Sequence, residues 1–137
     1  TRKRSSAASD VYKRQPNSYQ PNKMLIYMIK KQKGKIKIFN KKEIAVKNSD
    51  VVMTDKIISL NDKVNKKKKL KSFKNFKVDT KTMNLAKKDA IFLHCLPRGN
   101  EVTEEVFLGK QSRVWQQALN RVYVQKSILL YCFDKLR

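Results

Sequence analysis

The sequence predicts a three-layer α/β fold, with helices on both faces of an open parallel sheet. Short apolar segments alternate with helical segments along the 137 residues, and 40% of the residues are apolar, enough for a single core. Ligands of such sheets bind beyond the carboxyl ends of the strands. We therefore expect polar site residues in two segments, 55–61 after the second strand and 94–100 after the third.

The N-terminal segment lacks apolar periodicity. Five basic side chains surround a Ser/Ala stretch in residues 1–15, which we interpret as a disordered basic tail or a sequence scar. Residues 16–21 form a polar, Pro-bounded linker. The folded domain is therefore expected over residues 22–137.

The first elements of this domain alternate between helix and strand. Apolar residues at helical spacing from Met24 predict a helix that ends at Gly34. Charged and apolar residues alternate over residues 35–39, as is typical of a strand. A short helix over residues 42–47 and a buried apolar strand over residues 50–54 follow.

The later elements continue this order. Residues 62–73 predict a lysine-rich helix, and a threonine cap at Thr80 predicts a helix over residues 80–85. Residues 90–93 form a third apolar strand. The remaining expected elements are short strands over residues 76–78 and 112–115, and a long amphipathic helix over residues 116–133, with Ala118, Val122, Ile128 and Leu129 among its apolar positions.

Composition excludes several classes of function. The longest apolar run, Met24–Ile29, is far shorter than the roughly 18 residues that indicate a membrane span. Because an apolar secretory signal is also missing, we expect a cytoplasmic protein. Cys95 and Cys132 lack CxxC spacing, and the chain has one histidine, so neither a metal nor a cofactor is expected. Dinucleotide-binding, P-loop and hydrolase motifs are absent.

Polar residues follow both apolar strands. Asp55 closes the strand over residues 50–54, and Ser59 lies four residues later, where a carboxylate and a hydroxyl suit a ligand ammonium. His94 and Cys95 follow the third strand, and Pro97 forces the chain out of regular structure. The alternatives are that Asp55 caps a turn and that Cys95 is a small buried apolar residue.

Two basic features are candidates for binding anions. Arg121, early in the last helix, has a planar guanidinium that could reach an anionic or carbonyl oxygen, although a surface arginine is the commoner role. Six lysines lie between Lys63 and Lys71, and aromatic residues alternate with lysines over Phe73–Lys77. This stripe could contact nucleic acid. A solvated helix face explains it as well, because positive charge is spread over the whole chain, with a net charge of +22.

Four motifs in this order resemble the C-terminal part of ornithine carbamoyltransferases, from about Met24 to Leu130. His-Cys-Leu-Pro over residues 94–97 is the specific signature. The resemblance implies a Rossmann-like, ornithine-binding single domain of a two-domain homotrimeric enzyme. The motifs are Asp50–Asp55, Ser59–Asn61, Phe92–Arg98 with Glu101–Phe107, and Asn120-Arg121.

The resemblance also implies an activity and the residues that carry it. Carbamoyl phosphate would transfer its carbamoyl group to the δ-amine of L-ornithine, giving citrulline and phosphate in arginine biosynthesis or catabolism. Cys95 and Arg121 would be catalytic, with Arg121 at the carbonyl oxygen of carbamoyl phosphate. Ornithine would be held by Asp55, Ser59 and the backbone of Leu60 at its α-amino group, and by Cys95 and the Leu96 carbonyl beside its δ-amine.

The chain departs from the family pattern in three ways. Leu60 and Asn61 replace the usual Met-Gly, Ile57 replaces an aromatic residue, and Leu119 replaces a Glu before Asn-Arg. The Ser-x-Arg-Thr and His-Pro-x-Gln motifs of the carbamoyl-phosphate domain are absent. We therefore expect a fragment that is inactive alone. The alternatives are a carbamoyltransferase for another amino acid and a small basic nucleic-acid-binding protein, although nucleic acid is not the favoured partner.

Overall fold

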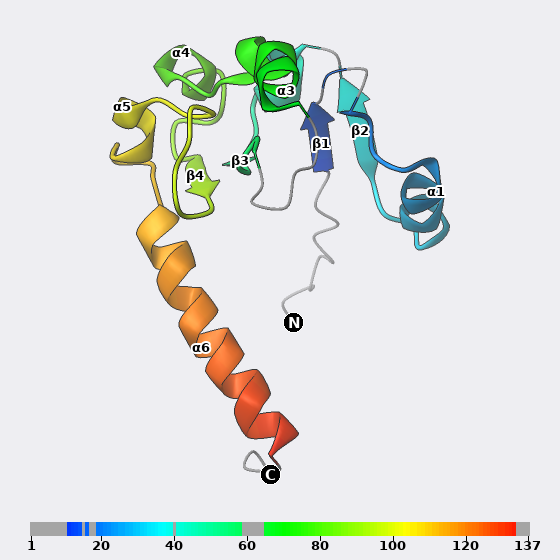
Figure 1. Cartoon of the computed structure of the whole chain (residues 1–137), viewed down its shortest axis with the longest axis vertical. Coiled ribbons are helices and arrows are strands. Elements are labelled where there is room, and N and C mark those ends of the chain that lie inside the picture. The colour runs from blue at the N-terminus through cyan, green and yellow to red at the C-terminus, as the bar shows by residue number, and fades with distance from the viewer. Residues whose placement is uncertain (1–10, 15, 17–18, 40, 59–64, 134–137) are drawn as a thin grey trace, which may run out of the picture.

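A computed structural model describes residues 11–14, 16, 19–39, 41–58 and 65–133 of the chain (Figure 1). Helices and strands alternate, which confirms the α/β class. The elements are β1 (Val11–Arg14), α1 (Lys23–Lys31), β2 (Ile36–Phe39), α2 (Lys42–Val46), β3 (Val51–Thr54), α3 (Lys66–Phe73), a 3-10 turn (Lys74–Phe76), α4 (Thr80–Met83), β4 (Ile91–His94), α5 (Glu104–Phe107) and α6 (Val114–Cys132).

The described strands pair in parallel, as two two-stranded sheets. β1 pairs with β2, with Val11 opposite Ile36. β3 pairs with β4, with Thr54 opposite His94 at the last position of the ladder. Parallel neighbours need a long crossover connection, and α3 and α4 lie within the one that joins β3 to β4.

Strand β1 corrects the expectation of a disordered tail over residues 11–14. This segment has no strand periodicity in the sequence, but its pairing with β2 satisfies backbone groups that an isolated segment would leave to water. The expected linker is also engaged, because the Tyr19 ring packs against Phe73 of α3 with centroids 5.2 Å apart. Residues 1–10 lie outside the described residues.

The core lies between the β3–β4 pair and the segments that pack against it, from the crossover between the two strands and from the chain after β4. Phe92 of β4 is fully buried at its centre. β3 is less buried than predicted, because Val52 alone is buried whereas Val51 and Met53 are exposed on the open face of a two-stranded sheet. The buried cluster comprises Val52, Val78, Met83, Phe92, Val102, Val106, Phe107 and Val114.

Two predicted short strands are reduced to single bridges. The expected strand over residues 76–78 is wrong: the chain makes a 3-10 turn and then one parallel bridge, between Val78 and Val102. Ser112 likewise forms a single bridge to Phe92 before α6 begins at Val114. Each bridge joins residues that are far apart in the sequence, so tertiary contacts decide the conformation of both segments.

Side-chain caps determine where two helices begin. Asn65 accepts a hydrogen bond from the Lys68 N–H and starts α3 at Lys66, later than predicted. Asp79, rather than the expected Thr80, caps α4, because its Oδ1 accepts hydrogen bonds from the hydroxyl and the N–H of Thr82 at 2.6 and 2.8 Å. The Thr82 hydroxyl is the main cause of the lowered pKa of Asp79.

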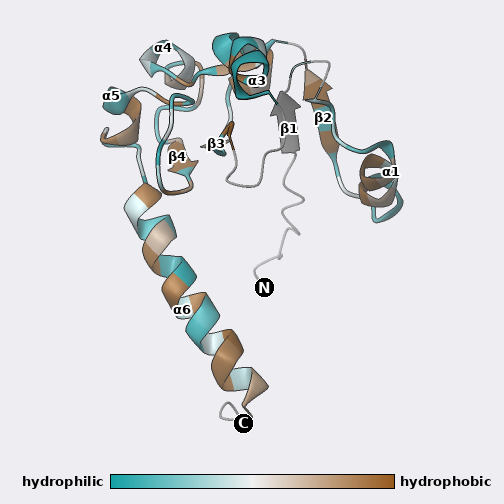
Figure 2. Ribbon diagram, viewed as in Figure 1, coloured by the Kyte–Doolittle hydropathy of each residue, from teal (hydrophilic) through white to brown (hydrophobic). Residues whose placement is uncertain are grey.

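Helix α6 extends away from the rest of the structure (Figure 1) and carries apolar residues along its length (Figure 2). Only Val114 in it is buried, so the predicted apolar positions Val122, Ile128 and Leu129 are exposed. The helix is nevertheless continuous over 19 residues. No described helix is long and apolar enough to cross a membrane.

Replacing the α4 cap should weaken the fold. Asp79→Ala is expected to lower the free energy of unfolding by about 1 kcal/mol, because Thr82 loses its acceptor. Since folding lowers the pKa of Asp79, its charge contributes stability above the pKa of the unfolded chain, and this contribution is lost as pH falls through the folded pKa. Urea unfolding at pH 7 and pH 3 measures both effects.

The matched control for this prediction is Asp79→Asn, which retains a capping oxygen but no charge. It should lose less stability than Asp79→Ala at pH 7 and depend less on pH than the parent chain. Equal unfolding free energies for the parent and Asp79→Ala at pH 7 would show that the cap contributes nothing.

Candidate functional site

Asp55 and Cys95 meet where β3 and β4 end. Each is the residue directly after its strand, and the pairing of Thr54 with His94 brings them together. The Cys95 thiol donates a hydrogen bond to Asp55 Oδ1, with the sulfur and oxygen 3.0 Å apart. The same oxygen accepts a hydrogen bond from the Lys56 N–H at 2.7 Å.

This contact changes the acidity of both groups in opposite directions. The hydrogen bond from Cys95, followed by that from the Lys56 N–H, lowers the pKa of Asp55. Burial, and then the neighbouring Asp55 carboxylate, raises the pKa of the Cys95 thiol. At neutral pH the pair is therefore a carboxylate beside a protonated thiol, which is a setting for binding a cation rather than for a reactive thiolate.

His94 lies fully buried beneath this pair. Its Nδ1 is 2.9 Å from the Thr54 carbonyl oxygen and 3.0 Å from the Thr54 hydroxyl. Its Nε2 is 2.9 Å from Glu101 Oε1. The ring stacks near Phe92 and meets Phe107 edge-on, with centroids 6.4 and 6.2 Å away.

The loop after β4 returns toward the site. The Leu96–Pro97 peptide bond is cis, Leu96 is exposed, and the Arg98 guanidinium lies 5.3 Å from the centre of the Phe107 ring. The Gly99 N–H donates a hydrogen bond to Glu101 Oε1 at 2.6 Å. Sequence reasoning missed Glu101 as part of this constellation, and the signal for it was a carboxylate close in sequence to the strand-end histidine.

The structure does not bring all of the expected site residues together. The Arg121 side chain is exposed on α6 and makes no hydrogen bond or ion pair with another described residue. Ser59, Leu60 and Asn61 lie outside the described residues. The described part of the expected site is therefore Asp55 and Cys95, with Leu96 next to Cys95.

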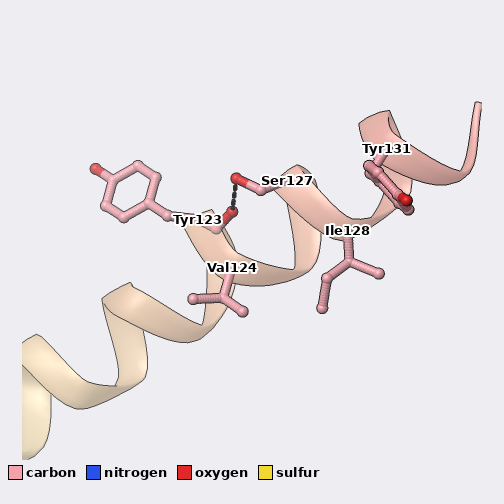
Figure 3. A pocket seen from close by; sticks show the side chains of 5 residues that line it. All are labelled: Tyr123, Val124, Ser127, Ile128 and Tyr131. Carbon is pink, nitrogen blue, oxygen red and sulfur yellow. Dashed lines mark hydrogen bonds between the residues drawn. The ribbon is translucent and has the colours of Figure 1, made fainter. Parts of the chain in front are cut away.

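A hollow on α6 is lined by neither a carboxylate nor a thiol. Its lining is almost wholly apolar, and the Ser127 hydroxyl already donates to the Tyr123 carbonyl oxygen at 2.9 Å (Figure 3). Among the described residues, no group of three His, Cys, Asp or Glu side chains is arranged to hold a metal ion. The hollow is lined by Tyr123, Val124, Ser127, Ile128 and Tyr131.

Comparisons with known proteins relate this chain to one family. Residues 5–132 match the family model described as aspartate/ornithine carbamoyltransferase, Asp/Orn binding domain. The chain is 44% identical over 133 residues to an ornithine carbamoyltransferase of Methanococcus maripaludis, covering 91% of this chain and 44% of that protein. It is 51% identical over 100 residues to one of Helicobacter hepaticus, covering 72% of this chain and 30% of that protein.

Solved structures show the same relationship. An anabolic ornithine carbamoyltransferase of Campylobacter jejuni matches with a TM-score of 0.82 and 36% identity, covering 92% of this chain and 44% of that one. The ornithine carbamoyltransferase of Pyrococcus furiosus matches with a TM-score of 0.78 and 34% identity, covering 89% and 41%. The chain thus spans less than half the length of these relatives.

The Asp55–Cys95 contact can be measured by thiol alkylation. In a Cys132→Ser background, the pH midpoint of iodoacetamide modification of Cys95 should lie above that of an unperturbed thiol. Asp55→Asn should lower this midpoint and speed the reaction at pH 8, because the carboxylate no longer disfavours the thiolate.

Asp50→Asn is the matched control for this measurement. Asp50 precedes β3 at its other end and pairs with Lys87, so its loss should leave the midpoint unchanged. An identical midpoint in the parent and in Asp55→Asn would mean that the two side chains do not interact in solution.

Proposed function

Because this chain belongs to the aspartate/ornithine carbamoyltransferase family, we propose that it is the ornithine-binding domain of an ornithine carbamoyltransferase. The whole enzyme would transfer the carbamoyl group of carbamoyl phosphate to L-ornithine, giving citrulline and phosphate in arginine metabolism. The Asp55–Cys95 pair at the ends of two parallel strands carries the proposal, because it offers a carboxylate and a neutral thiol to an amine.

Ornithine carries two amines, and Asp55 suits the one that stays charged. Its carboxylate is exposed, and its lowered pKa keeps it ionised at neutral pH, so it can accept charge-assisted hydrogen bonds from the α-ammonium. We assign Ser59 and the Leu60 backbone to the same group. This assignment favours ornithine over N-acetylornithine and putrescine, which lack a free α-ammonium beside a carboxylate.

The δ-amine must lose a proton before it attacks. An alkyl amine with a pKa of about 10.4 is only about one part in a thousand neutral at pH 7. A thiolate at residue 95 would stabilise the ammonium, whereas the protonated thiol does not, and the raised pKa of Cys95 favours the thiol. The Leu96 carbonyl would accept a hydrogen bond from the neutral amine and orient its lone pair.

Arg121 is assigned to the carbamoyl group. The amine forms a bond to the carbonyl carbon, phosphate leaves with the electron pair of the broken C–O bond, and the nitrogen releases a proton. A guanidinium at the carbonyl oxygen would stabilise the charge that develops there. Since the 137 residues hold neither Ser-x-Arg-Thr nor His-Pro-x-Gln, we propose that they bind ornithine weakly and form no citrulline alone.

The partners and the setting of the whole enzyme follow from the same proposal. We propose a cytoplasmic homotrimer with no metal or other cofactor. The ornithine-binding domain would cover residues 22–137, with β1 added to it. Exposed lysines on α3 are assigned to a solvated helix face, not to nucleic acid, because the net charge of +22 is spread over the chain.

Binding of ornithine is the direct test. Titration calorimetry of the 137-residue chain should detect weak binding of L-ornithine, and Asp55→Asn should weaken it about tenfold or more, as for a lost hydrogen bond to a charged group. Asp50→Asn should bind as the parent does. Putrescine binding as tight as ornithine binding would contradict the assignment of the α-ammonium, and no ornithine binding would overturn the proposed function.

Catalysis can be tested in a chimera. This chain, placed in the Methanococcus maripaludis relative over the matched region, should form citrulline from ornithine and carbamoyl phosphate, whereas the 137 residues alone should not. Arg121→Ala in the chimera should lower kcat by roughly 100-fold, because the oxyanion loses a donor. Cys95→Ala should also lower kcat. Unchanged kcat in either variant would remove that residue from the catalytic site.

A further inference from the structure

His94 joins three parts of the chain through a single buried ring. It belongs to β4, its Nδ1 contacts the last residue of β3, Thr54, and its Nε2 contacts Glu101 in the loop beyond β4. The His94 and Glu101 side chains are 0% and 5% exposed. Water cannot substitute for these contacts without opening the core, so the ring fixes the three segments relative to one another.

Glu101 accepts hydrogen bonds both at its backbone and at its side chain. The Glu101 carbonyl oxygen accepts a hydrogen bond from the Val78 N–H at 2.9 Å, and Oε1 accepts one from the Gly99 N–H at 2.6 Å. A Cβ on Gly99 would lie 2.6 Å from Glu101 Oε2, so a larger residue at this position would displace the carboxylate. The carboxylate therefore has one well-defined position against His94.

Thr54 and His94 are the last residues that the β3–β4 ladder pairs, and Asp55 and Cys95 come next. Beyond the ladder, backbone hydrogen bonds between the strands no longer set the distance between these two segments. We propose that His94 and Glu101 are positioning residues, which hold the ends of β3 and β4 so that Asp55 and Cys95 stay in contact. Any effect of this contact on ornithine binding rests on the proposed function. The contact between Asp55 and Cys95 can be measured in the 137-residue chain by itself.

A buried polar contact such as that between His94 and Glu101 can also be purely structural. In that case its loss lowers stability but leaves the Asp55–Cys95 contact intact in the folded molecules. The pH midpoint of Cys95 alkylation helps to separate the two roles, because it depends on the carboxylates near the thiol, on Asp55 first and on Glu101 least, and not on the unfolding free energy. A positioning role predicts that the midpoint moves.

The experiment uses the Cys132→Ser chain and the variant Glu101→Gln, which preserves shape but removes the charge. We expect the midpoint to fall toward that of Asp55→Asn, with alkylation at pH 8 faster by roughly threefold, the change for half a pKa unit. Combining Glu101→Gln with Asp55→Asn should produce little further fall, because a positioning role acts through Asp55, whereas a direct effect of the Glu101 charge on the thiol would add to the effect of Asp55→Asn.

Two further variants keep the test decisive. Gly99→Ala retains His94 and Glu101 but displaces the carboxylate, and it should shift the midpoint even if Glu101→Gln fails to fold. Val106→Ala removes core packing in α5 and should lower stability without moving the midpoint. A parent-like midpoint in folded Gly99→Ala and Glu101→Gln would overturn the positioning role.

Ornithine titration of the same variants links the two proposals. If the parent binds ornithine, Glu101→Gln and Gly99→Ala should weaken binding by about as much as Asp55→Asn does. If the parent does not bind ornithine, the proposed function fails, while the alkylation profiles still decide whether His94 and Glu101 position the pair.

Discussion

The parallel pairing of β3 with β4 is the constraint on which the rest of the structure depends. Its register places Val52 opposite Phe92 in the core and Thr54 opposite His94 at the carboxyl end. Burial of Phe92 stabilises the pair from within, because a slip of one residue would turn that side chain to the open face. The same register that buries the core therefore brings Asp55 to Cys95.

Carboxylates are scarce in this basic chain, and the described ones are used where position matters. The chain has 11 acidic residues against 33 basic ones. Asp55 accepts hydrogen bonds at the strand ends, Asp79 caps α4, and Glu101 contacts His94 inside the core. Each of these three carboxylates contacts a specific partner, whereas salt screens their general attraction to the positive charge at the surface.

Residues of the apolar core also pack against residues near the polar site. Phe107 contacts the ring of His94 on one side and receives the Arg98 guanidinium on another, so the loop that carries Cys95 is packed from below. Arg121 is not packed against the core, because only Val114 of α6 is buried and the arginine lies farther along this exposed helix. Within the described residues, the site thus has the Asp55–Cys95 pair at the strand ends and an arginine on an exposed helix.

The sequence by itself determined the alternation of the main helices and strands and the placement of Asp55 and Cys95 directly after apolar strands. Local periodicity and the strand-end rule suffice for this, because both act within a few residues. Tertiary structure decided the rest. β1 exists through a partner more than twenty residues away, Glu101 reaches His94 through the return of a loop, and the apolar positions of α6 stay exposed because no described element packs on them. Contacts distant in sequence have no local signature, so only the folded chain shows them.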